Sequence, residues 1–323
     1  MKKNSLKKPT KLNLFLGLCI SILQEIRGKK PIFLPVDIDS YSFVKKVSNS
    51  TDMNKYAIGI YKRAGKKVFI KTWFGLIYNY EYYDLINEYF ATRTLARILA
   101  RQKIMDYGYK IKVPKVIDVI RKKGSISLVF EYVNGKKLSQ LSKKKKIDVI
   151  SEILKTFSDV SRSLTREIKK DLAKQSLFYF LFTFPLFTVL DIISNVKNLR
   201  VIMRACFDFF KSIKSIKKQG FTLAFRDLNK DNILVRGSSI YLVDCGRLSL
   251  TIYGYDFECL ALCLYFRDIY KEVYKNLNYN TNKFLLTHNL IHHAYSYDHS
   301  GSNRNESVIK LYELYGNKRE LRN

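Results

Sequence analysis

The sequence predicts an α+β protein, with strands gathered in its first half and helices mostly in its second. Residues 66–73 and 126–131 are short apolar runs rich in β-branched and aromatic side chains, which is typical of strands. Apolar residues recur at helical spacing in residues 84–101 and again in 147–164. The chain has 323 residues, 47% of them hydrophobic. That is enough to bury two cores, and it argues against disorder.

The first predicted strand, 66–73, begins with Lys66 and Lys67 and then carries one lysine, Lys71, among apolar neighbours. The helix predicted at 84–101 contains no proline or glycine. Glu88 lies next to the apolar stripe of this helix, so it can face inward and pair with Lys71. Two further acids nearby are fallback partners: Glu81 and Asp84.

Two more strands are predicted at 116–120 and 126–131, on either side of a turn at 121–124 that ends in glycine. The second of them runs into the segment Glu-Tyr-Val-Asn-Gly, residues 131–135. The two runs therefore predict an antiparallel hairpin.

The most informative stretch places an acid, Asp227, five positions before an amide, Asn232. Two short apolar strands follow, at 234–235 and 240–243, and then a second acid, Asp244, before Cys-Gly. A hairpin of this kind would hold the polar groups on a rigid element. The alternative is a surface loop rich in turn-forming residues. The joint occurrence of both motifs at this separation favours the functional interpretation.

This stretch resembles the kinase catalytic loop H-R-D-x-x-x-x-N, followed by the metal-binding D-F-G. The resemblance implies a bilobal protein-kinase-like fold, with an N-lobe of antiparallel sheet plus helix and a mostly helical C-lobe. It also implies a kinase that uses ATP and Mg²⁺. Asp227 would be the catalytic residue that accepts or orients the hydroxyl proton, while Asn232 and Asp244 would hold the metal.

The same resemblance implies roles for the N-terminal half. Lys71 is similar to the lysine of the V-A-I-K strand, which pairs with the α- and β-phosphates, and Glu88 to the helix glutamate that supports it. Backbone groups at Glu131 and Val133 would read adenine at the hinge. The implied organisation is a basic N-terminal extension at 1–39, an N-lobe at 40–133 and a C-lobe at 134–323.

Two positions and one missing motif depart from the kinase pattern. Phe225 replaces the histidine of the catalytic loop, Cys245 replaces the central phenylalanine of D-F-G, and no G-x-G-x-x-G loop is present. Gly65 fits a hairpin turn instead. These departures support an alternative function, a pseudokinase that serves as a nucleotide-binding or scaffolding module.

Nine residues separate Gly246 from Asp256, and no A-P-E motif follows. Protein kinases insert a long activation segment at this place. The chain therefore resembles the small-molecule and glycolipid kinases, which include aminoglycoside phosphotransferases, Kdo kinases and lipopolysaccharide core kinases. In that branch Asp256 would brace the catalytic loop through its backbone amides. An atypical Ser/Thr protein kinase is a further alternative.

The formal net charge is +30. A field of this size attracts anionic membranes, acidic glycolipids or nucleic acid, although a lysine-rich composition also follows from an AT-rich genome. No nucleic-acid-binding motif is recognisable, so we expect ATP, a small-molecule or glycolipid acceptor and an anionic membrane surface as partners. The use of ATP and the few cysteines predict a cytoplasmic protein, peripheral on the inner face of the membrane.

Two segments suggest where the charge acts. Residues 12–26 have the pattern of an interfacial helix with basic flanks. Residues 177–190 form an aromatic run too short to span a membrane and interrupted by Pro185. A buried helical hairpin and a contact with acceptor or lipid explain this run equally well.

His288 and its C-terminal neighbours are expected on a helix surface rather than at a zinc site.

Overall fold

The computed structural model describes residues 6–10, 12–13, 16–17, 20, 37–47, 56–75, 78–100, 106–194, 199–216 and 220–295. The chain forms two compact units. Unit 1 comprises Met1–Arg101, Lys112–Gly135 and Tyr241–Arg247, and unit 2 comprises Gln102–Ile111, Lys136–Ile240 and Leu248–Asn323. Of the predicted helix at 12–26, the described residues 12, 13, 16, 17 and 20 are helical, and the rest lies outside the described residues.

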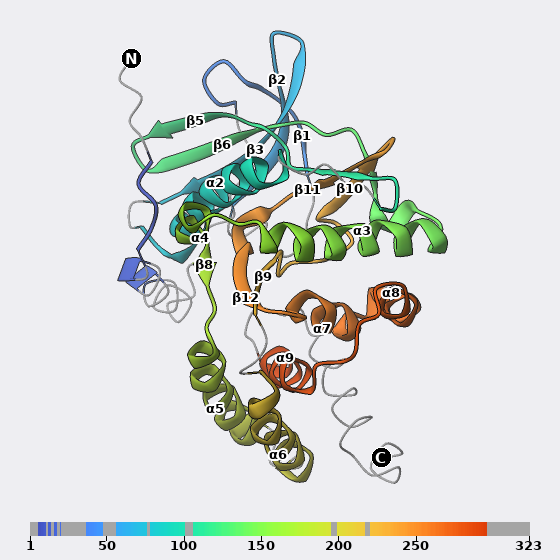
Figure 1. Ribbon diagram of the computed structural model, residues 1–323. Helices are drawn as coiled ribbons and strands as arrows, with labels where there is room; N and C mark the ends of the chain where they lie inside the picture. The colour runs from blue at the N-terminus through green and yellow to red at the C-terminus, as the bar shows by residue number, and fades with distance from the viewer. Residues whose placement is uncertain are drawn as a thin grey trace. The chain divides into compact units, whose positions relative to one another are not determined.

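Unit 1 is built on a five-stranded antiparallel sheet with the order β1-β2-β3-β6-β5, seen at the top of Figure 1. Its strands are β1 (Ser42–Lys46), β2 (Ala57–Arg63), β3 (Lys66–Phe74), β5 (Val116–Lys122) and β6 (Ser125–Glu131). The long helix α2 (Tyr80–Leu99) covers one face of the sheet. Leu85 and Ile86 of the helix pack there against Trp73, Leu128 and Phe130 of the strands.

Tight turns set the register of this sheet. Ala64 and Gly65 join β2 to β3 with φ of 49° and 77°, the two left-handed conformations that match the twist of a two-residue hairpin. Gly65 is thus the hairpin turn expected from the sequence. β1 and β2 were not predicted from the sequence.

Helix α2 begins four residues before the predicted position. Asn79 caps it, because its side-chain oxygen accepts hydrogen bonds from the Tyr82 amide and from the Trp73 indole at 2.9 Å. An N-cap of this kind satisfies a backbone donor that the first helical turn leaves without a partner. The aromatic residues after Asn79 therefore become helical.

Unit 2 holds most of the remaining elements, shown in Figure 1. Its helices are α3 (Lys143–Arg162), α4 (Arg166–Asp171), α5 (Leu177–Ser194), α6 (Leu199–Ile216), α7 (Tyr255–Leu262), α8 (Tyr270–Asn276) and α9 (Lys283–Tyr295). One sheet has the order β8-β12-β9, formed by Ala173–Lys174, Ser249–Ile252 and Phe221–Ala224. The other has the order β4-β11-β10-β7, formed by Lys110–Lys112, Ser239–Leu242, Ile233–Arg236 and Lys136–Lys137.

Aromatic rings form the core where α5, α6 and α9 meet. Phe184 and Phe209 stack with centroids 3.6 Å apart, and Phe209 stacks on Phe284 at 4.4 Å. His288 lies in this core and is bonded to the Thr183 hydroxyl at 3.0 Å. The expectation of a surface position for His288 was therefore wrong, because its ring packs among the phenylalanines.

Two local predictions also need correction. Helix α5 continues through Pro185, so the proline does not interrupt it. Helix α3 begins at Lys143, four residues before the helical pattern predicted at 147–164. Among the residues that the structure describes, no helix combines the length and apolarity needed to cross a membrane.

Candidate functional site

In unit 1, β3, α2 and the segment after β11 bring three charged side chains together. The Nζ atom of Lys71 lies 2.9 Å from Oε2 of Glu88 and 3.4 Å from each carboxylate oxygen of Asp244. Lys71 and Glu88 are each 4% exposed. The Asp244 side chain keeps 33% of its surface exposed. The lysine is thus fixed by two carboxylates, one buried and one open to ligands.

Burial acts on both members of the inner pair. Burial alone would lower the pKa of Lys71, but the charges of Asp244 and Glu88 outweigh it and the pKa is raised. Burial likewise raises the pKa of Glu88, against the opposing effect of the lysine charge. Lys71 therefore remains a cation at all physiological pH values.

Tyr56 and Asp84 complete this cluster, although the sequence did not single them out as a pair. The Tyr56 ring lies 4.5 Å from Nζ of Lys71, and its hydroxyl donates to the Glu81 carbonyl at 2.9 Å and to Asp84 Oδ2 at 3.3 Å. Burial raises the pKa of Asp84. Asp84 was a fallback partner for Lys71, whereas Glu81 contributes its backbone carbonyl. A lone tyrosine at a strand start gives no sequence signal for such a role.

The segment after β11 has an unusual backbone. Asp244 has a φ of +58°, which is uncommon for a residue with a side chain. The Asn87 side chain donates to the Gly246 carbonyl at 2.6 Å and ties the segment to α2. Cys245 is buried, and burial raises the pKa of its thiol well above the usual value. Cys245 thus takes a packing position, as a core side chain does.

In unit 2, Asp256 holds the loop that carries Asp227. Its carboxylate accepts the N–H of Phe225 at 2.7 Å and the N–H of Arg226 at 2.9 Å, which is the bracing expected from the sequence. Burial raises the pKa of Asp256 to about 6, although both backbone bonds lower it. Arg226 has a φ of +63°, so the two bonds stabilise a backbone conformation that a non-glycine residue rarely adopts.

Two amides hold the Asp227 carboxylate. Nδ2 of Asn232 donates to Oδ2 of Asp227 at 2.9 Å, and Nδ2 of Asn229 donates to Oδ1 at 3.2 Å. The Oδ1 atom of Asn229 accepts the backbone N–H groups of Asp231 and Asn232 at 2.8 and 3.0 Å. Asn229 was missed in the sequence because an asparagine in a turn usually has a purely local role.

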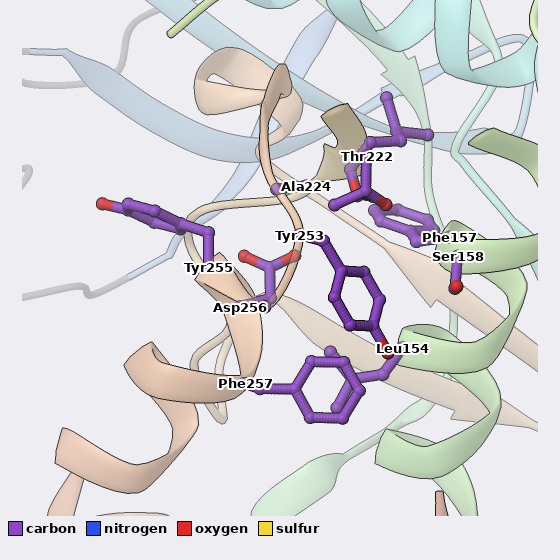
Figure 2. Close-up of a pocket in the computed structure, with 11 residues that line it drawn as sticks. Leu154, Phe157, Ser158, Thr222, Ala224, Tyr253, Tyr255, Asp256 and Phe257 are labelled. Atoms are coloured by element: carbon purple, nitrogen blue, oxygen red, sulfur yellow. Dashed lines mark hydrogen bonds between the residues drawn. The ribbon is translucent and has the colours of Figure 1, made fainter. Parts of the chain in front are cut away.

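Figure 2 shows the small cavity next to the Asp256 carboxylate, which points toward the strand residue Ala224. Tyr253 and Phe257 form part of its wall, together with Phe157 of α3. Its volume of about 10 Å³ fits one water molecule and no substrate. The cavity therefore lies beside the carboxylate that holds the Asp227 loop, and it is not a substrate pocket.

The predicted adenine-reading residues end β6 and follow it. The N–H of Glu131 donates to the Lys115 carbonyl at 2.9 Å, and Oε2 of Glu131 accepts the Lys115 amide at 3.2 Å. Val133 is buried. The Glu131 amide is thus used within unit 1, and the roles of Glu131 and Val133 in adenine binding stay predictions.

Each unit thus carries one polar cluster. Unit 1 brings together Lys71, Glu88 and Asp244, and unit 2 brings together Asp227 and Asn232 above Asp256. Among the described residues no group of three or more His, Cys, Asp and Glu side chains suits a metal ion by itself.

No protein-family model matches the sequence, and no curated protein does. Solved structures do match. A spectinomycin phosphotransferase in complex with ADP and spectinomycin is 16% identical, with a TM-score of 0.52 over 93% of this chain and 88% of its own. A thermostable mutant of the aminoglycoside phosphotransferase APH(4)-Ia, in ternary complex with AMP-PNP and hygromycin B, is 9% identical, with a TM-score of 0.60 over 92% of this chain and 98% of its own.

A third similar structure is an amicoumacin kinase with AMP-PNP and Ca²⁺, at 10% identity and a TM-score of 0.51 over 95% of this chain and 96% of its own. At these identities the likeness establishes the fold. The chain has the protein-kinase-like fold of aminoglycoside phosphotransferases, and the fold predicted from the sequence is confirmed.

Proposed function

We propose that the chain is an ATP- and Mg²⁺-dependent phosphotransferase that acts on a hydroxyl group of a small molecule or glycolipid. The observation that carries this proposal is the buried ion cluster of Lys71, Glu88 and Asp244. Phosphate binding next to a metal needs a lysine that is held in place by a buried acid, together with a second acid whose carboxylate is partly exposed. The similar solved structures contain ADP or AMP-PNP, which supports an adenine nucleotide here.

Lys71 would bind the α- and β-phosphates, and Glu88 would keep its ammonium group in place. The oxygen donors of Asp244 and Asn232 fit Mg²⁺, which prefers carboxylate and amide oxygens. The exposed third of Asp244 supports this fit, because one face of its carboxylate is open while Lys71 holds the other. When bound, the metal supplies positive charge that offsets the phosphate oxygens.

Asp227 would accept the proton of the acceptor hydroxyl. Asn229 and Asn232 already fix both of its oxygens, so the carboxylate needs little reorganisation to orient a nucleophile. Asp256 would be a positioning residue, since its carboxylate holds the backbone that leads into Asp227.

The segment before α7 supports a small acceptor over a protein. Residues 249–252 form β12, which pairs with β9 on one side and β8 on the other. Gly254, with a φ of +98°, then turns the chain directly into α7. The sheet uses this segment, so little chain is left to build a platform for an extended peptide.

The acceptor class that suits the charge is an anionic or lipid-linked sugar. Lys169, Lys170 and Lys174 are exposed just before α5, the helix of the aromatic run that is the candidate for contact with the acceptor. Such cations would attract phosphate or carboxylate groups on a sugar. The need for ATP would place this reaction in the cytoplasm.

Transfer of labelled phosphate from ATP tests the proposal. Purified protein would be assayed against sugars, aminoglycosides, lipid extracts and generic proteins, with Asp227→Asn as the matched inactive control. Transfer to a small-molecule or lipid pool that the control lacks is the expected result. Robust transfer to proteins alone would contradict the acceptor class, and nucleotide binding without transfer to any pool would favour the pseudokinase.

A further inference from the structure

Helix α5 is apolar on both sides, although one side faces solvent. Its inner side buries Phe180 and Phe184 in the aromatic core of unit 2. Its outer side exposes Phe178, Phe182 and Val189, which follow one another at helical spacing. A soluble helix normally places polar residues on this outer side.

Helix α6 repeats the pattern. Phe209 and Ala205 are buried in the same core. The opposite side exposes large apolar residues at every turn: Leu199, Met203, Phe207 and Phe210. Each of the two helices therefore carries a stripe of exposed apolar residues. Single apolar residues scattered over a surface are normal, but two such stripes are not.

The two stripes lie on neighbouring helices. Both helices contact α9 and each other, as seen at the bottom of Figure 1. Phe184 and Phe209 stack on each other, Phe209 stacks on Phe284 of α9, and Phe180 meets Phe284 edge-on. Each exposed stripe lies on the side of its helix opposite to these rings. We call the seven exposed residues the α5–α6 apolar face: Phe178, Phe182, Val189, Leu199, Met203, Phe207 and Phe210.

The face is large for a surface in water. Its four phenylalanines are 75%, 66%, 68% and 55% exposed in chain order. They alone present on the order of 500 Å² of apolar area. Apolar patches of more than a few hundred Å² on a soluble protein usually mark an interaction site.

Basic residues accompany the apolar stripe of α6. Helix α6 carries four basic residues, Arg200, Arg204, Lys211 and Lys214, against one acid, Asp208. Lys211 Nζ lies 6.0 Å from the centre of the exposed Phe207 ring, so an apolar and a cationic group share one spot. Lysine and arginine stems of this kind lie along an apolar surface while their charges reach the polar layer above it.

We propose that the α5–α6 apolar face docks on an anionic phospholipid bilayer, with both helices lying in the plane of the interface. Phenylalanines on one side and basic residues around them are the pattern of interfacial helices. The basic residues of α6 complement anionic headgroups. A second copy of the chain fits less well, because two molecules of charge +30 repel each other. This proposal does not depend on the phosphotransferase activity.

Sedimentation of the full chain with vesicles tests the docking. Phe182→Ser/Phe207→Ser removes the centre of the face, and Val44→Ser/Ile117→Ser removes two exposed apolar residues of the unit 1 sheet as a matched control. On vesicles of phosphatidylglycerol and phosphatidylcholine, the first variant should partition at least about tenfold more weakly than wild type. The control variant should partition as strongly as wild type. Added salt should weaken the binding of the control and of wild type alike. Equal partition of the Phe182→Ser/Phe207→Ser variant and wild type would overturn the proposal, as would a wild-type dimer that this variant dissociates.

A spectroscopic probe locates the contact directly. The chain has one tryptophan, Trp73, which is buried in unit 1. Phe182→Trp adds a reporter to the face, so its emission should shift to the blue on anionic vesicles and be quenched by lipids with brominated acyl chains. Wild-type emission should stay unchanged under the same conditions. An unshifted Phe182→Trp signal in fully vesicle-bound protein would overturn the proposal, and circular dichroism would verify that each variant is folded.

Discussion

Lys71 and Glu88 form a buried ion pair in which Nζ lies 2.9 Å from Oε2, and Asp244 approaches the same ammonium group at 3.4 Å. The pair joins a strand to a helix across 17 residues of sequence. Removal of one partner leaves a buried charge without compensation, which is costly even where the intact pair contributes little.

The first prediction follows from this pair. Lys71→Met should lower the free energy of unfolding by roughly 3–5 kcal/mol, because Glu88 and Asp244 lose their cation. Denaturation by urea measures the effect. The double variant Lys71→Met/Glu88→Leu should lose clearly less than the sum of the two single variants. Strict additivity would show that the two side chains do not interact.

The second prediction concerns pH. The folded pKa of Asp256 is raised to about 6, so the folded protein binds more protons than the unfolded chain between about pH 4 and 6. The stability contributed by this group is therefore complete below pH 4 and is lost as the pH rises through 6. Relative to Asp256→Asn, wild type should lose up to about 3 kcal/mol of unfolding free energy across this window. Parallel pH profiles of the two proteins would refute the shift.

The third prediction assigns Asn229 a positioning role. Asn229→Ala removes the donor to Asp227 and the acceptor for two backbone amides, so kcat should fall by about 10-fold or more while nucleotide affinity stays near wild type. Lys230→Ala, in the same loop, is the matched control and should change neither quantity to that extent. A parallel loss of nucleotide affinity would place Asn229 in the binding site instead.

The fourth prediction tests the metal ligand. Asp244→Asn keeps the shape of the side chain and removes its charge, so nucleotide binding should lose most of its enhancement by Mg²⁺. Titration of ATP with and without Mg²⁺, followed by calorimetry, measures this difference. Full retention of the enhancement would remove Asp244 from the metal site.

The sequence was most informative where residue spacing reflects chemistry. The separation of Asp227, Asn232 and Asp244 pointed to the kinase-like fold, and the order of strand and helix brought Lys71 to Glu88. Tyr56 escaped prediction because its role arises only when β2 lies next to β3 and its ring meets Lys71. Contacts of that type depend on tertiary packing and leave no local pattern.

The ends of helices and the side of a helix that faces solvent were harder to predict, because they too depend on tertiary packing. The cap by Asn79 extended α2 toward the N-terminus, and packing around Phe184 kept α5 helical through Pro185. The apolar residues of α5 gave no sign of which side faces solvent, since Phe178 and Phe180 look alike in the sequence. The partners that bury Phe180 are Tyr255 of α7 and Phe284 and His288 of α9, far along the chain.

The central claim is that the chain transfers phosphate from ATP with Asp227 as the catalytic residue. The most direct measurement compares initial rates of transfer for wild type and Asp227→Asn on the best acceptor pool, with nucleotide binding measured in parallel. Asp227→Asn should keep its nucleotide affinity and lose about 10²–10⁴ in turnover. Equal turnover of Asp227→Asn and wild type would contradict the account.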